Sequence, residues 1–96
     1  MSITRINEFT AFPGKLDDLI DAFQVIIPSI KFAKGCESCE LLIPANGKEK
    51  VVIIEQWASI AAHKDAAKLI AGSDFKRIMT LLDGAPSGKY FTPTAG

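Results

Sequence analysis

The sequence predicts an α+β domain of the ferredoxin-like type, with the element order β-α-β-β-α-β and a four-stranded antiparallel sheet. Three observations support this fold class. Residues 50–57 contain four successive β-branched side chains, which favour a strand because branching at Cβ fits poorly in a helical turn. Apolar residues at helical spacing follow this strand and also follow an earlier strand-like segment. Asn46-Gly47, which lies between two strand-like runs, is a strong hairpin signal.

The composition indicates one domain that does not rely on a charged partner. The chain has 96 residues, and 48% of them are hydrophobic, which is sufficient for a single core. Eleven Lys and Arg residues balance eleven Asp and Glu residues, so no net field attracts nucleic acid or an anionic membrane. No segment resembles a signal peptide or approaches the ~20 apolar residues of a membrane span. We therefore expect a cytoplasmic protein with one domain over residues 1–96.

The first strand is expected over residues 3–12, where apolar side chains are mixed with Arg5, Asn7 and Glu8. A helix should run from Pro13-Gly14 to near Lys34-Gly35, with a kink or restart at Pro28 because proline has no amide hydrogen to donate. One side of this helix is apolar and should pack on the sheet. The apolar residues are Leu16, Leu19, Ile20, Phe23, Ile26 and Ile27, whereas Asp17, Asp18, Asp21 and Gln24 lie on the opposite side.

The second strand is expected over residues 36–44, followed by a turn over residues 45–48 and the central strand over residues 50–57. Because side chains alternate across a strand, the central strand presents apolar residues to both faces of the sheet. Val51, Ile53, Glu55 and Trp57 share one face, whereas Val52, Ile54 and Gln56 share the other.

The next helix should begin after Ser59, whose side chain can cap it, and should end at Gly72. Its inner side is predicted to contain Ile60, His63, Ala66, Ala67 and Ile70. Ser73 and Asp74 should cap a short additional helix with a buried stripe of Phe75, Ile78, Met79 and Leu82. Residues 84–88 are expected to form a loop, and residues 89–92 a short last strand.

In a ferredoxin-like layout both main helices cover the same side of the sheet, so the other side is left without a layer above it. That side is not polar here, and burying it stabilises by roughly 25 cal/mol per Å² of apolar surface. A homodimer packed sheet to sheet is therefore predicted. The alternative is a monomer whose open sheet face binds a ligand or another protein.

Several motifs resemble one protein family. The run Glu55-Gln-Trp57-Ala-Ser59, with the β-branched residues before it and the helix containing His63 after it, resembles the antibiotic biosynthesis monooxygenase (ABM) domain of the dimeric α/β barrels. The segment Phe9-Thr-Ala-Phe-Pro13-Gly14 and the Gly35-Cys36 start of the second strand fit the same family. The resemblance covers nearly the whole chain.

The resemblance implies a pocket between the helices and the sheet of each subunit. Some members of the family oxidise phenols or quinols with O₂ without a cofactor, and others degrade haem. By resemblance, Asn7 is expected to orient the ligand and His63 to assist proton removal. The predicted contacts to an aromatic substrate are Phe9, Trp57, Phe75 and Tyr90. Haem is disfavoured because the third helix has Lys76, Arg77 and Met79 where haem-degrading relatives carry their ligand, so no cofactor is expected.

Each of these residues also has a structural interpretation. His63 could be a histidine at the edge of the core, and Trp57 a packing residue or part of a dimer interface. Glu55 is expected to form a structural ion pair with Arg5 or Lys89, because a buried charge is costly unless it is paired. Asn7 could equally make a hydrogen bond at an interface.

The pair Cys36 and Cys39 invites a redox or metal interpretation. A strand position would send the two side chains to opposite faces, and the chain offers no further Cys or His cluster for zinc. Reduced thiols, no disulfide and no metal site are therefore predicted, and a thiol redox role would fail if both cysteines could be replaced by serine.

The sequence thus leads to two functional hypotheses of different class. The first is a cofactor-independent monooxygenase that oxidises a small aromatic quinol or phenol in an apolar pocket. The second is a non-enzymatic small-molecule binding or interaction protein with the same dimeric fold.

Overall fold

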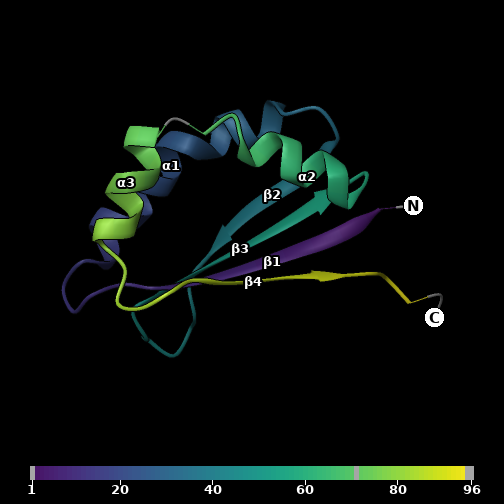
Figure 1. Ribbon diagram of the computed structural model, residues 1–96. Coiled ribbons are helices and arrows are strands. Elements are labelled where there is room, and N and C mark those ends of the chain that lie inside the picture. The colour runs from purple at the N-terminus through teal and green to yellow at the C-terminus, as the bar shows by residue number, and fades with distance from the viewer. Residues whose placement is uncertain (1, 71, 95–96) are drawn as a thin grey trace.

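The structure is a computed structural model that describes residues 2–70 and 72–94. Within these residues, four strands form one antiparallel sheet, and the helices cover only one of its faces (Figure 1). The sheet order β2-β3-β1-β4 and the chain order confirm the predicted ferredoxin-like α+β fold. The elements are β1 (Ile3–Thr10), α1 (Leu16–Phe32), β2 (Cys36–Leu42), β3 (Lys50–Trp57), α2 (Ile60–Ala67), α3 (Gly72–Thr80) and β4 (Ser87–Phe91).

β1 lies inside the sheet, between β3 and β4. It pairs with β3 through Arg5 opposite Glu55 and with β4 through Asn7 opposite Gly88. Every second residue of β3 is buried, as the alternation predicts: these residues are Val51, Ile53, Glu55 and Trp57. Because residues that face each other across strands share a side of the sheet, Arg5 and Asn7 of β1 lie beneath the helices together with Glu55 of β3.

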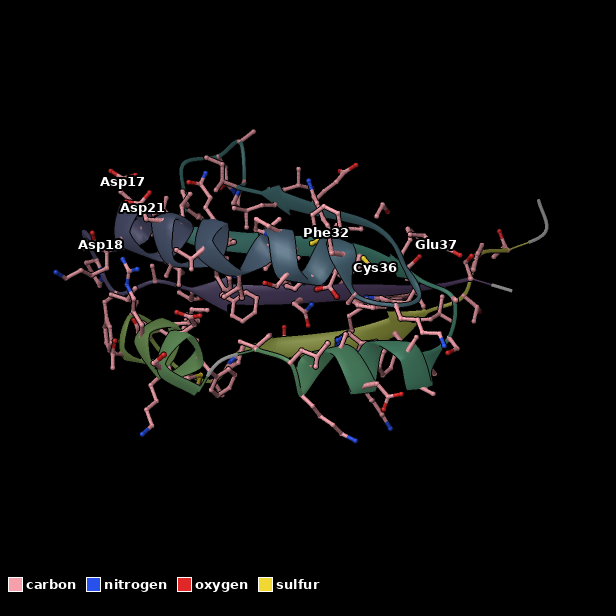
Figure 2. All side chains as sticks on the ribbon, turned by 90° about the horizontal axis from the view of Figure 1, so that it is seen from above. Asp17, Asp18, Asp21, Phe32, Cys36 and Glu37 are labelled. Carbon is pink, nitrogen blue, oxygen red and sulfur yellow. The ribbon has the colours of Figure 1, made fainter. Side chains whose placement is uncertain are left out.

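The main core lies between α1 and the sheet. Its buried residues include the predicted helix positions Leu19, Phe23 and Ile26, which pack against Val51 and Ile53 of β3. The acidic residues Asp17, Asp18 and Asp21 are exposed at the N-terminal end of α1 (Figure 2). The amphipathic pattern of this helix therefore predicted its orientation on the sheet correctly.

Pro28 does not restart α1. The helix continues through Pro28 to Phe32, so of the two predicted alternatives, a kink or a restart, the restart does not occur, and the helix ends slightly before the expected Lys34-Gly35. Pro28 is exposed, so the carbonyl group of Gln24, which proline cannot engage, lies on the solvent side of the helix, where water can satisfy it.

The region of α2 and α3 differs from the prediction in two respects. α2 ends at Ala67, and Gly72 begins α3 instead of ending α2. Of the stripe predicted to be buried, Ile78 and Leu82 are buried, but Phe75 and Met79 are 55% and 41% exposed. Ile60, predicted to lie on the inner side of α2, is also 40% exposed. Short helices that pack on a sheet bury only part of their apolar side chains, so the helical periodicity overestimated the burial of these residues.

β2 contains an irregularity that corrects the prediction for the cysteines. Cys36 faces Trp57 and Cys39 faces Glu55, because the register shifts between Cys36 and Ser38. The extra residue reverses the alternation, so both cysteines point to the helix-covered face. The expectation of opposite faces is therefore wrong. Figure 2 shows Cys36 and Glu37 beside Phe32, where the chain leaves α1 and enters β2.

The loops also differ in length from the prediction. β2 ends at Leu42, so a loop over residues 43–49 replaces the short turn expected from Asn46-Gly47, although Gly47 does adopt a positive φ of 79°. β4 begins at Ser87 and includes Gly88, which was expected to belong to a loop. None of the helices formed by residues 2–70 and 72–94 is long and apolar enough to cross a membrane.

Candidate functional site

A cavity of about 280 Å³ lies between the sheet and the three helices. Seen from above the helices, α1 lies on one side of the molecule and α2 and α3 on the other, with β1 visible between them (Figure 2). Most of the lining side chains are apolar. They are Phe9, Phe23, Ile26, Ile30, Ile53, Ala66, Ala67, Ile70, Phe75, Ile78, Met79 and Pro86, and the remaining lining residues are Arg5, Asn7, Glu55, Trp57, His63, Ser87 and Gly88.

Glu55 is the centre of the polar part of the cavity. The residue is only 4% exposed, yet both of its carboxylate oxygens accept a hydrogen bond. Trp57 Nε1 donates to Oε1 at 2.7 Å, and Asn7 Nδ2 donates to Oε2 at 3.0 Å. These bonds offset part of the cost of burying a carboxylate and fix its orientation.

Arg5 completes this group from β1. Its Nε donates to Asn7 Oδ1 at 2.9 Å, and since arginine can only donate, this bond fixes which end of the amide faces Glu55. The guanidinium carbon lies 4.6 Å from the centre of the Tyr90 ring, within the range of a cation–π contact. Gly88 of β4 leaves the required space, since a Cβ atom there would lie 2.6 Å from Asn7 Oδ1 and would also collide with the Arg5 guanidinium.

His63 of α2 lies next to this group. Its Nδ1 is 2.7 Å from the Tyr90 hydroxyl, and its Nε2 is 3.9 Å from Glu55 Oε1. The imidazole also makes edge contacts with the rings of Trp57 and Tyr90, with centroids 5.5 and 5.4 Å apart. A carboxylate near Nε2 favours the tautomer that carries its proton on Nε2, so Nδ1 accepts the hydrogen bond from Tyr90.

Burial shifts the two titratable groups in opposite directions. It raises the pKa of Glu55, although hydrogen bonds from Trp57 and Asn7 and the charge of Arg5 oppose the shift. Burial lowers the pKa of His63 below its usual value, and the positive charges of Arg5 and Lys64 add to the shift. His63 is therefore neutral at pH 7, and its 3.9 Å approach to Glu55 is not an ion pair.

Cys36 and Cys39 lie next to this site but do not line the cavity. Both are free thiols, and burial together with the nearby charge of Glu55 raises the pKa of Cys39 to about 12. A thiol with so high a pKa stays protonated at neutral pH and is a poor nucleophile. In the part of the chain that the structure describes, no cluster of three or more His, Cys, Asp or Glu residues could hold a metal ion.

The structure brings the residues that the sequence singled out to one place. Asn7, Phe9, Trp57, His63 and Phe75 all line the cavity. Tyr90 is not among the lining residues and reaches the site through its hydrogen bond to His63.

One prediction for this region is wrong. Glu55 was expected to pair with Arg5 or Lys89, but among the described residues it forms no salt bridge with either. Trp57 and Asn7 bind its carboxylate, and the Arg5 side chain bonds to Asn7.

Two residues of the site, Glu55 and Arg5, were not among the predicted site residues. Glu55 and Trp57 are two positions apart on one strand, as are Arg5 and Asn7, so alternation already placed each pair on the same face. The facing of Arg5 and Glu55 across β1 and β3 could not be read from the sequence, because it depends on strand register.

Comparison with known proteins places the fold in a family. The model of the family "Antibiotic biosynthesis monooxygenase" matches residues 2–78 of the chain. No protein with a curated description matches it.

Several solved structures are similar over almost their whole length. SnoaB, a cofactor-independent oxygenase from Streptomyces nogalater, has a TM-score of 0.83 at 18% identity, with 99% of this chain and 95% of that chain covered. A protein from Pseudomonas aeruginosa has a TM-score of 0.86 at 22% identity, with coverage of 98% and 95%. A conserved protein from Methanosarcina mazei Go1 has a TM-score of 0.86 at 12% identity, with coverage of 98% and 94%. At such identities the likeness is one of fold.

Proposed function

The chain belongs to the antibiotic biosynthesis monooxygenase family, and from this premise we propose that it is a cofactor-independent monooxygenase that oxidises a small aromatic phenol or quinol with O₂. The observation that carries the proposal is the composition of the cavity. Its walls are mostly apolar, and Arg5, Asn7, Trp57 and His63 form a contiguous group around Glu55. Such a site holds an aromatic ring in the apolar part and one hydroxyl group at the polar end. The similar fold of SnoaB, a cofactor-independent oxygenase, supports the same reaction class.

The reaction needs little from the protein beyond a proton acceptor and a dry cavity. Conversion of a phenol to a quinone by O₂ balances when one oxygen atom enters the ring and the other leaves as water, so the substrate supplies all the electrons. The phenolate reacts more readily than the phenol, and donors placed around its oxygen stabilise it most effectively where water is excluded. We assign substrate orientation to Asn7 and assistance of proton removal to His63. Phe9, Trp57, Phe75 and Tyr90 shape the cavity.

The volume of the cavity limits the size of the substrate. A cavity of about 150 Å³ in another protein is large enough for benzene, and the cavity here measures about 280 Å³. A ring system of about two fused rings therefore fits. Phe75 and Met79, which line the cavity while remaining partly exposed, place its opening beside α3.

Oxygen uptake tests this proposal. The purified protein should consume O₂ with at least one member of a panel of monocyclic and bicyclic phenols and quinols, and it should form the quinone. Asn7→Ala and His63→Ala should each lower kcat/KM by 10²-fold or more, as expected for loss of a group that acts in the transition state. Turnover unaffected by both changes would remove this site assignment.

The competing function is that of a binding protein. Tight binding of aromatic ligands in the cavity without any O₂ consumption would favour this second class over the monooxygenase. A structure with a ligand in the cavity would then identify its chemical class.

We also propose that the protein is a homodimer that packs through the face of the sheet that no helix covers. On this face Ile6, Val52 and Ile54 remain half-exposed, and Leu42 and Phe91 are exposed. A second copy would cover these side chains by a symmetric sheet-to-sheet contact. The cavity opens on the other side of the sheet, so the dimer would leave it accessible.

A further inference from the structure

We propose that Glu55 is the catalytic base of this site and that the substrate hydroxyl binds between Glu55 Oε1 and His63 Nε2. The inference rests on the proposed monooxygenase function and deepens it, because it assigns the proton acceptor to a residue other than His63. In this arrangement His63 assists as a neutral hydrogen-bond donor, and Tyr90 is a positioning residue that occupies its Nδ1.

The hydrogen bonds of His63 leave it only one role toward a ligand. Its Nδ1 is occupied by the Tyr90 hydroxyl at 2.7 Å. Only Nε2 remains, and in the tautomer that the nearby Glu55 carboxylate favours, this nitrogen carries the proton. His63 can therefore donate to a substrate oxygen but cannot accept its proton.

Glu55 has the acceptor capacity that His63 lacks. An ionised carboxylate oxygen can accept two hydrogen bonds, and Oε1 receives one, from Trp57 at 2.7 Å. Oε2 receives its bond from Asn7 at 3.0 Å. Oε1 therefore has an unused acceptor position, and it is the oxygen that lies 3.9 Å from His63 Nε2.

The gap between the two atoms suits a single oxygen atom. Nε2 and Oε1 are 3.9 Å apart, too far for a direct hydrogen bond. An oxygen atom placed beside the line joining them reaches both at about 2.8 Å, with roughly a right angle at that oxygen. A phenol hydroxyl in this position donates to Oε1 and accepts from Nε2.

The proposed step transfers one proton. The substrate O–H bond breaks, the proton moves to Oε1 to form the carboxylic acid, and the electron pair stays on the phenolate oxygen. The Nε2–H group holds this oxygen by a hydrogen bond. No electrons leave the substrate in this step, and its oxidation by O₂ follows.

The surrounding charges are compatible with this assignment. The charge of Arg5 on β1 acts on Glu55 of β3, and the thiols of Cys36 and Cys39 on β2 lie near the same carboxylate. The charge of Lys64 on α2 acts on His63. Tyr90 of β4 contacts His63 directly. The side chains that α1 and α3 contribute to the cavity carry no charge: they are Phe23, Ile26, Ile30, Phe75, Ile78 and Met79.

Ligand binding tests the proposed hydroxyl site without any turnover. The wild-type protein should bind α-naphthol about tenfold or more tightly than its methyl ether, because only the free hydroxyl can donate to a buried carboxylate. Glu55→Gln should reduce this ratio to near one. His63→Ala should instead weaken the binding of both ligands and keep the preference, because either oxygen can accept from Nε2–H. Glu37→Gln, which neutralises an exposed glutamate of β2 outside the cavity, should keep it. Equal affinities of the wild type for both ligands would overturn the hydroxyl site.

Kinetics test which residue accepts the proton. With a phenol that the protein oxidises, kcat/KM of the wild type should fall as the pH drops through the pKa of Glu55. Glu55→Gln should lower kcat/KM by about 10²- to 10⁴-fold and abolish this acid limb. His63→Gln, which retains a donor but cannot act as a base, should keep the limb with a smaller loss. If the limb persists in Glu55→Gln or disappears in His63→Gln, Glu55 is not the base.

The two assays separate failure of the inference from failure of the proposed function. Absence of O₂ uptake across the whole panel would reject the monooxygenase, and with it the role of Glu55 as a base. The ratio of the affinities for α-naphthol and its methyl ether would still test the hydroxyl site. Turnover with an acid limb that does not depend on Glu55 would reject only the inference.

Glu55→Asp replaces Glu55→Gln in both assays if Glu55→Gln does not fold. It keeps the carboxylate but withdraws it from Nε2, so it should retain the acid limb and lose the naphthol preference. An unchanged preference would overturn the proposal.

Discussion

At the scale of single residues, Glu55 determines how the site is built. It lies among Val and Ile on the central strand, where an apolar residue would pack more easily, and only 4% of it is exposed. Trp57 and Asn7 each donate to one of its oxygens, and Arg5 holds Asn7 in turn. Three side chains are thus ordered around one carboxylate, so a change at Glu55 affects all of them.

The raised pKa of Glu55 predicts how the stability of the protein depends on pH. Between the unfolded pKa near 4.5 and the higher folded pKa, the folded state binds more protons than the unfolded state, so this group contributes more stability as the pH falls through that window. The free energy of unfolding of the wild type, minus that of Glu55→Gln, should therefore increase from about pH 8 to about pH 5.

Urea denaturation at several pH values measures this difference. The titration of His63, whose lowered pKa acts in the opposite direction, is present in both proteins and should largely cancel. A difference that stays constant or decreases toward acid pH would contradict the assignment of a raised pKa to Glu55.

At the scale of elements, α2 positions His63. The helix extends only from Ile60 to Ala67, and its first turn is held by Ser59, whose Oγ accepts the amide hydrogen of Ala62 at 3.1 Å. Ala62 also packs against Gly35, where an added Cβ would lie 2.6 Å from the Ala62 Cβ and the φ of +88° disfavours any other residue. A glycine is therefore required for α2 to approach the start of β2.

Removal of the cap should loosen α2. Ser59→Ala is expected to lower the free energy of unfolding by about 0.5–2 kcal/mol, because a side-chain acceptor for one free amide is lost. Ser29→Ala, at an exposed position inside α1, is the matched control and should have little effect. Thermal and chemical denaturation measure both variants. Equal stability of Ser59→Ala and the wild type would show that the cap is not needed.

At the scale of the whole molecule, the two faces of the sheet differ in whether helices cover them. The helices cover one face, whereas the other presents Ile6, Val52 and Ile54 from the two central strands without a covering layer. Ile6 and Ile54 are paired across β1 and β3, so they lie side by side near the middle of this face. Burial of such a surface is the physical basis of the proposed dimer.

Substitution at the centre of this face tests the dimer. Light scattering coupled to size exclusion should give about twice the 10.4 kDa mass of the chain for the wild type. Ile54→Lys should give a monomer with an unchanged circular dichroism spectrum. Val25→Lys, on the exposed side of α1, is the control and should remain dimeric. A wild-type protein that is monomeric at micromolar concentration would contradict the proposal.

The sequence alone determined the element order and the face of each long element that is buried. These features follow from local periodicity: Val51, Ile53 and Trp57 alternate along a strand, and Leu19, Phe23 and Ile26 recur on one side of a helix.

Only the tertiary structure decided how the polar residues are paired. The positions of Arg5 opposite Glu55 and of Asn7 opposite Gly88 depend on register, and the common face of Cys36 and Cys39 depends on a bulge. The approach of His63 to Glu55 depends on how α2 docks on the sheet. Contacts between residues distant in sequence are set by the packing of whole elements, which local periodicity does not encode.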